Sequence, residues 1–134
     1  MTKRDQKELL RYIRWVADEL ELRDWTLTLL DTPAPADALG HMSETYGRKV
    51  AEIQVCSDFR NLDAEQQRHT IVHELVHCHL ASPTNMVLND LEEELSDTAD
   101  RIFWSGYKRQ IEYSTDALAS ALAKHLPLID WPKT

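Results

Sequence analysis

The most chemically loaded part of the chain is a run of eleven residues, Thr70 to Leu80, that reads TIVHELVHCHL. Its apolar residues predict a helix that is at least partly buried, where an imidazole is costly unless its nitrogens have partners. His73 and His77 are four residues apart, so a helix places them one turn apart on the same face. Two imidazoles arranged in this way can bind one metal ion together.

Glu74 follows the first of these histidines and completes the pattern HExxH. It is rotated by about 100° from His73 around the helix axis, so it need not bind the ion itself. It lies where a carboxylate can take a proton from a water molecule at the metal, and HExxH on a helix is the signature of zinc hydrolases for that mechanical reason. The same pattern occurs by chance on surface helices, but the apolar Leu75 and Val76 inside it favour the metal site.

A catalytic zinc ion needs a third protein ligand and keeps one position open. The later histidines are poorly placed, because His79 points off the ligand face and His125 has no accompanying pattern. We therefore expect a carboxylate as the third ligand. One candidate is Glu112, and the other is a member of the triplet Glu92, Glu93, Glu94.

Glu112 has the more suitable surroundings. Asp116, Ala119 and Ala123 lie on its side of the predicted last helix, and small alanines allow close approach to another helix. Asp116 can accept a hydrogen bond from the second ring nitrogen of a ligand histidine and so fix its tautomer. Within the triplet, Glu92 is the member that faces inward most. The residues favour Glu112 and leave the triplet as the alternative.

Helices and a small sheet must hold these residues in place. The predicted helices cover 6–22, 63–80, 88–105 and 109–125, and the predicted strands cover 25–30, 39–45 and 48–56. Ser82-Pro83 predicts the end of the motif helix, Gly106 a break before the last helix, and Tyr46-Gly47 the turn of a hairpin. We therefore expect an α+β fold with a three-stranded sheet and about four helices, in a single domain that spans residues 1–134.

The sequence also predicts the N-caps and the apolar faces of these helices. Asp5 and Asp63 are the expected N-caps of the first two helices. The apolar faces of the last two helices are expected to be formed by Leu88, Leu91, Leu95, Ala99 and Ile102, and by Ile111, Leu118, Leu122 and Leu126.

Composition and charge exclude several classes of protein. The net charge of −8 and the isoelectric point near 5.1 argue against binding to nucleic acid, which needs a basic surface. No apolar run approaches the roughly 18 residues that a membrane span needs. The polar N-terminus lacks the apolar core of a signal peptide, so we expect a cytoplasmic protein, in which Cys56 and Cys78 stay reduced.

The span from Trp25 to Pro127 resembles the small phage and actinobacterial zinc-metallopeptidase-like proteins, which are minimal zincins of the gluzincin type. The segments that carry the resemblance are a W-x-L-x-L strand, RKVAEIQV, RHTIVHELVH and IEYSTDALASAL. The resemblance implies a zincin-like fold, Zn²⁺ bound by His73, His77 and Glu112, and Glu74 as the general base. It also implies that Asp116 supports a ligand histidine, and it fits the cytosol of a bacterium or of a phage-infected host.

The expected function is zinc-dependent hydrolysis of a peptide or protein substrate. The substrate would pair with an exposed strand edge, for which 50–55 is the candidate. His41, Tyr46 and Tyr113 are candidates for stabilising the oxyanion, although a structural role is the simpler interpretation of each. His69 lies one turn before His73 on the same stripe and either lines the cleft or is a partly exposed helix residue, whereas Cys78 and His79 turn away from that stripe.

Two other functions compete with this prediction. The first is a zinc-stabilised binding module that has the same fold and does not cleave peptides. The second is a metal hydrolase that acts on a substrate other than a peptide, which ranks last because the chain is acidic and lacks a three-histidine arrangement. The sequence leaves the oligomeric state open.

Overall fold

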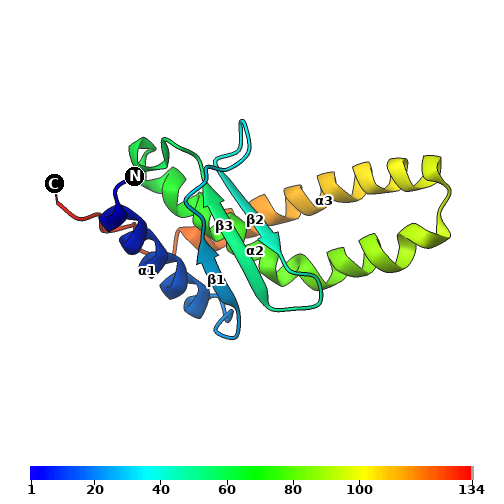
Figure 1. Ribbon diagram of the computed structural model, residues 1–134, viewed down its shortest axis with the longest axis horizontal. Coiled ribbons are helices and arrows are strands. Elements are labelled where there is room, and N and C mark those ends of the chain that lie inside the picture. The colour runs from blue at the N-terminus through cyan, green and yellow to red at the C-terminus, as the bar shows by residue number, and fades with distance from the viewer. Residues whose placement is uncertain (134) are drawn as a thin grey trace.

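The computed structural model describes residues 1–133 and has the expected α+β class. Its sheet has three strands, β1 (Thr26–Leu29), β2 (Gly40–Glu44) and β3 (Val50–Val55), in the order β1-β3-β2. β3 pairs in parallel with β1 and antiparallel with β2, so the predicted hairpin of β2 and β3 is confirmed. The sheet is mixed, and β2 forms one of its two edges (Figure 1).

The core lies between one face of the sheet and two helices, α1 (Lys3–Glu19) and α2 (Ala64–Met86). Alternation along β3 buries Ala51, Ile53 and Val55, as its sequence predicts. A short 3₁₀ turn, η1 (Phe59–Asn61), adds the buried ring of Phe59 before α2 begins.

The two expected N-caps differ in outcome. The side chain of Asp63 accepts a hydrogen bond from the backbone N–H of Gln66, which confirms it as the N-cap of α2. Asp5 is not the N-cap of α1. Thr2 takes that position, and Asp5 completes a capping box with it, because α1 begins three residues earlier than its apolar face predicts.

The second half of the chain forms a long hairpin of α2 and α3 (Asp97–Ala123). A π-helical turn, η2 (Val87–Leu91), and a 3₁₀ turn, η3 (Glu92–Glu94), join the two helices. Figure 1 shows the hairpin running out beyond the sheet, on the side away from both chain termini. From residue 82 to residue 114 no side chain is buried.

Three predicted boundaries in this hairpin are wrong. α2 continues through Pro83 to Met86, and α3 is unbroken at Gly106, so residues 1–133 contain three α-helices instead of about four. The third helix begins at Asp97 instead of residue 88. Proline and glycine weaken a helix without forbidding it, and α2 and α3 contact each other, so neither residue ends its helix.

Part of the predicted apolar face of α3 is also wrong. Leu118 is 46% exposed and Ile102 is 71% exposed, whereas the buried side chains of α3 are Thr115, Ala119 and Ala123. The small residues bring α3 close to α2, and the larger leucines are left outside. The alanine side identified beside Glu112 in the sequence is therefore the packed side.

Every helix within residues 1–133 is too short or too polar to cross a membrane.

Candidate metal centre

His73, His77 and Glu112 come together between α2 and α3. The Nε2 atoms of the two imidazoles are 3.2 Å apart. One carboxylate oxygen of Glu112 lies 3.3 Å from Nε2 of His73, and the other lies 3.2 Å from Nε2 of His77. The three side chains predicted as metal ligands therefore point their donor atoms at one another, although 35 residues of sequence separate Glu112 from His77.

The donor set and its spacing fit a zinc ion. Zinc takes imidazole nitrogen and carboxylate oxygen as ligands at about 2.0–2.2 Å, and neighbouring ligand atoms of such a tetrahedron are then about 3.3–3.6 Å apart. The two Nε2 atoms, 3.2 Å apart, are close to that edge length, and each of them has one oxygen of Glu112 at 3.2 to 3.3 Å. One ion can therefore be held by these three side chains and keep a fourth position open.

The alternative third ligands lie elsewhere. Glu92, Glu93 and Glu94 form η3, where all three are exposed at the far end of the hairpin. Within residues 1–133, the groups of side chains close enough to share an ion are His73, His77 and Glu112, and His69, His73 and Asp116. Neither group includes the triplet, so the geometry favours Glu112.

Asp116 lies one turn beyond Glu112 on α3 and contacts the same histidine from the other side. Its Oδ1 accepts a hydrogen bond from Nδ1 of His73 at 2.8 Å, and it lies 3.7 Å from Nε2 of His69. A ring that donates from Nδ1 keeps its lone pair on Nε2, which is the atom that faces Glu112. His69 thus lies at the outer end of this chain of contacts instead of among the predicted ligands.

Burial keeps His77 suited to binding a metal. It lowers the pKa of the imidazole, which favours the neutral ring, while the carboxylate of Glu112 opposes the shift. A neutral imidazole is the form that coordinates.

Glu74 lies in the wall of the same site and is only 6% exposed. Burial, together with the negative charge of Glu112, raises the pKa of this carboxyl to about 8. The first residue of β2 packs directly against it: a Cβ added at Gly40 would lie 2.9 Å from Oε1 of Glu74 and 2.7 Å from Cγ2 of Thr70. The absence of a side chain at Gly40 therefore allows β2 to approach the HExxH glutamate.

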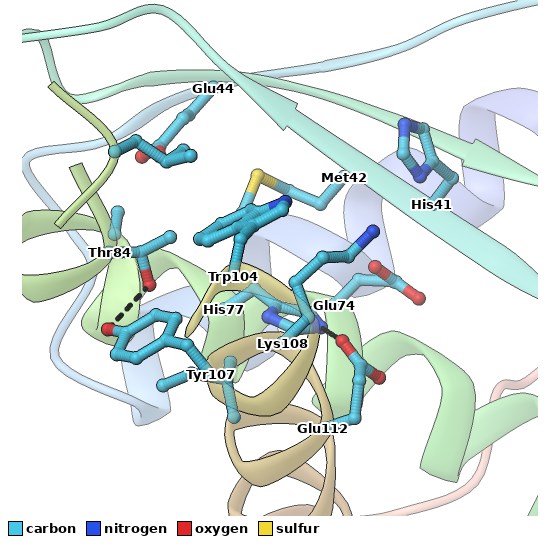
Figure 2. A pocket seen from close by; sticks show the side chains of 13 residues that line it. His41, Met42, Glu44, Glu74, His77, Thr84, Trp104, Tyr107, Lys108 and Glu112 are labelled. Atoms are coloured by element: carbon cyan, nitrogen blue, oxygen red, sulfur yellow. Dashed lines mark hydrogen bonds and ion pairs between the residues drawn. The ribbon is translucent and has the colours of Figure 1, made fainter. Parts of the chain in front are cut away.

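A cavity of about 430 Å³ opens beside these residues, between β2 and the α2–α3 hairpin (Figure 2). Glu74, His77 and Glu112 are among the residues that line it. Its apolar wall comes from β2, α2, the turn η2 and α3, and is formed by Met42, Ala81, Leu88, Trp104 and Ile111. The candidate metal site is thus accessible from a hollow that can hold part of a ligand.

The strand beside this cavity is not the one that the sequence suggested. Residues 50–55 form β3, which is paired on both sides, so the prediction of an exposed edge there is wrong. The free edge next to the metal site belongs to β2, because His41, Met42 and Glu44 line the cavity. A hairpin pattern shows which strands are adjacent, but it does not show which of them gains a third strand as a neighbour.

Of the three oxyanion candidates, one lies in the lining of the cavity and two lie outside it. His41 lines the cavity. Tyr46 lies in the β2–β3 turn, beside a different hollow, and Tyr113 is exposed on α3 outside the lining. Sequence reasoning missed Tyr107 and Lys108, which do line the cavity. Lys108 lies four residues before Glu112, so helical spacing from the third predicted ligand could have identified it.

Cys78 is buried in the core, whereas the neighbouring His79 is exposed, and neither joins the predicted ligands. Burial raises the pKa of the Cys78 thiol to about 12, which makes it a poor nucleophile. His79 extends to the end of α1, where its Nε2 lies 2.6 Å from the carbonyl oxygen of Leu20. Cys56 and Cys78 are both free thiols, in agreement with the prediction.

No model of a protein family, no curated protein and no solved structure matches the chain.

Proposed function

We propose that this protein is a zinc-dependent metallopeptidase of the gluzincin type. The observation that carries the proposal is the convergence of His73, His77 and Glu112 on one point, with donor atoms 3.2 to 3.3 Å apart. Glu74 adds a carboxylate to the wall of the same cavity. Two histidines and a carboxylate with one open position form the ligand set of a catalytic zinc site, whereas a structural site fills all four positions.

Zinc held by these ligands would polarise a substrate carbonyl and lower the pKa of a water molecule. Glu74 would accept the proton of the attacking water and deliver it to the leaving amine as the carbon–nitrogen bond breaks. His73 would be held in one orientation by Asp116 throughout. The low exposure of Glu74 keeps bulk water from competing for the transferred proton.

The edge of β2 is the proposed binding site for the peptide backbone. An extended peptide can pair with the free N–H and C=O groups of an edge strand, which holds its backbone in register while its side chains occupy neighbouring pockets. His41, Met42 and Glu44 place this edge along the cavity that contains Glu74. A peptide bond aligned on β2 would therefore pass the candidate metal centre.

Metal analysis and two variants test the proposal. We expect about one zinc ion per purified chain, loss of the metal in His77→Ala, and metal retention without peptide cleavage in Glu74→Gln. A mixed peptide library analysed by mass spectrometry measures cleavage. Freshly purified protein without a metal would contradict the proposal. Bound zinc without Glu74-dependent cleavage would indicate the zinc-stabilised binding module instead.

A further inference from the structure

The cavity beside the metal centre contains one cation among acidic groups. Within residues 1–133, the charged side chains of Lys, Asp and Glu that line it are Lys108, Glu44, Glu74 and Glu112. Figure 2 shows the side chain of Lys108 extending from α3 across the cavity toward β2. An isolated ammonium group in a hollow with three carboxyl groups suggests a binding role that the metal chemistry does not explain.

Lys108 is not held by its acidic neighbours. Its ammonium group forms no ion pair with any of residues 1–133 and lies 6.0 Å from the centre of the Trp104 ring. Lys108 and Glu112 are four residues apart on α3, but a lysine that precedes its glutamate is the less favourable order for a helical ion pair. The positive charge therefore remains available to a ligand.

The wall beneath Lys108 is apolar and is held in shape by aromatic packing. Tyr107 stacks on Trp104, with ring centres 5.8 Å apart, and its hydroxyl lies 3.5 Å from Oγ1 of Thr84 on α2. Leu88 and Ile111 line the same wall. The cavity of about 430 Å³ thus has both apolar side chains and a cation in its lining.

We infer that this cavity binds a substrate residue with an apolar side chain and that Lys108 binds a carboxylate of the substrate next to it. The inference rests on the proposed peptidase function. Lys108 and Glu112 are about one helical turn apart, and their Cα atoms are separated by about 6 Å along the axis of α3. An extended residue spans about 3.3–3.6 Å, so the carboxylate lies one or two residues beyond the cleaved bond. It is either the C-terminal carboxylate or an Asp or Glu side chain.

Thiol probes measure this recognition without requiring turnover. Mercaptoacetyl-leucine, its C-terminal amide and mercaptoacetyl-glycine share a zinc-binding thiol and differ in the carboxylate or in the apolar side chain. Mercaptoacetyl-leucyl-aspartate amide supplies a carboxylate on a side chain only. We would measure the Kd of each probe for zinc-loaded protein by calorimetry, with zinc content and circular dichroism recorded for every variant.

We expect the wild-type protein to bind at least one of the two carboxylate probes about tenfold more tightly than mercaptoacetyl-leucine amide, since a charge-assisted hydrogen bond has about that effect. Lys108→Met should abolish the difference and Lys108→Arg should keep it. Lys124→Met, which removes the same charge from the end of α3 outside the cavity, should leave it unchanged. Trp104→Ala should reduce the preference for leucine over glycine.

The possible outcomes either identify the carboxylate or show which proposal fails. Preference for mercaptoacetyl-leucine indicates a C-terminal carboxylate, and preference for the aspartate probe indicates a side chain. Probes that bind zinc but are insensitive to both the carboxylate and Lys108→Met would overturn the inference and leave the peptidase proposal standing. Equal weakening of acids and amides by Lys108→Met would also overturn it, in favour of a role near the metal itself. Lack of zinc or of thiol binding would overturn both proposals.

Discussion

Asp116 and His73 meet across the interface between α3 and α2, with Oδ1 of the carboxylate 2.8 Å from Nδ1 of the ring. This contact occupies one ring nitrogen and leaves the other facing His77 and Glu112. The tautomer of His73 is therefore set by α3, the same helix that supplies Glu112. One helix both completes the proposed ligand set and orients a ligand of the other helix.

Asp116→Ala should weaken zinc binding without abolishing it. Removing the hydrogen-bond partner of a ligand histidine typically costs about 10–100-fold in metal affinity. Competition with a chromophoric chelator measures the change. Asp100→Ala removes a carboxylate from the first turn of the same helix, away from the site, and should leave the affinity unchanged. Equal affinity of Asp116→Ala and wild type would show that Asp116 does not support the metal ligand.

Glu112→Ala should weaken zinc binding far more than Glu93→Ala. Glu112 presents both carboxylate oxygens to the two imidazoles, whereas Glu93 is exposed in η3 at the far end of the hairpin. Loss of a ligand leaves two protein donors, which is fewer than a catalytic zinc site uses. Zinc content after dialysis, measured by mass spectrometry, compares the two variants directly. The reverse order of effects would move the third ligand to the triplet.

Helical spacing was sufficient to predict one side of the site. His73, Glu74 and His77 lie on one unbroken stretch of α2, so their relative positions follow from helix geometry alone. Glu112 was predicted by the pattern around it, because small alanines mark the side of a helix that can approach another one. The distances and the contact of Asp116 with His73 agree with that pattern.

The boundaries and faces of the hairpin could not be predicted in the same way. Pro83 and Gly106 are local signals for helix ends, but both lie inside helices that pack along each other. The leucines of α3 were expected to be buried because apolar periodicity usually marks the core. Leu118 and Leu122 are exposed because the interface with α2 admits only the small Thr115, Ala119 and Ala123. Strand order likewise depends on a long-range pairing, that of β1 with β3.

The metal-free protein should lose stability as the pH rises from about 4.5 to about 8, in part because of Glu74. Its carboxyl has a pKa raised from the ordinary 4.5 to about 8 in the folded protein. Because the pKa is higher in the folded protein, ionisation of this carboxyl opposes folding. The resulting loss of stability is absent below pH 4.5, grows between pH 4.5 and about 8, and is constant at higher pH. Each pKa unit corresponds to about 1.4 kcal/mol, so the penalty is on the order of a few kcal/mol.

Glu74→Gln removes this titration. The free energy of unfolding of the metal-free variant, relative to that of the metal-free wild type, should therefore be higher at pH 8 than at pH 5. Urea unfolding of both proteins across this pH range, with a chelator present, measures this difference in stability. The other titrating groups are the same in both proteins, so the difference reports on Glu74. Zinc should reduce the difference, because a nearby dication favours the ionised carboxylate. A difference that does not change with pH would show that the Glu74 carboxyl is not perturbed by burial.

Alanine at the two glycines Gly40 and Gly106 should have opposite effects on stability. A Cβ at Gly106 would meet nothing within 4 Å, and Gly106 lies inside the continuous helix α3. Gly106→Ala should therefore raise the free energy of unfolding by about 0.5–1 kcal/mol. A Cβ at Gly40 would lie 2.7 Å from Cγ2 of Thr70 and 3.0 Å from Cγ of Glu74, so Gly40→Ala should lower it by about 1–3 kcal/mol. Urea unfolding of zinc-loaded protein measures both changes.

Destabilisation by Gly106→Ala would argue for a break in α3. An unchanged free energy of unfolding in Gly40→Ala would show that β2 does not press against the HExxH glutamate.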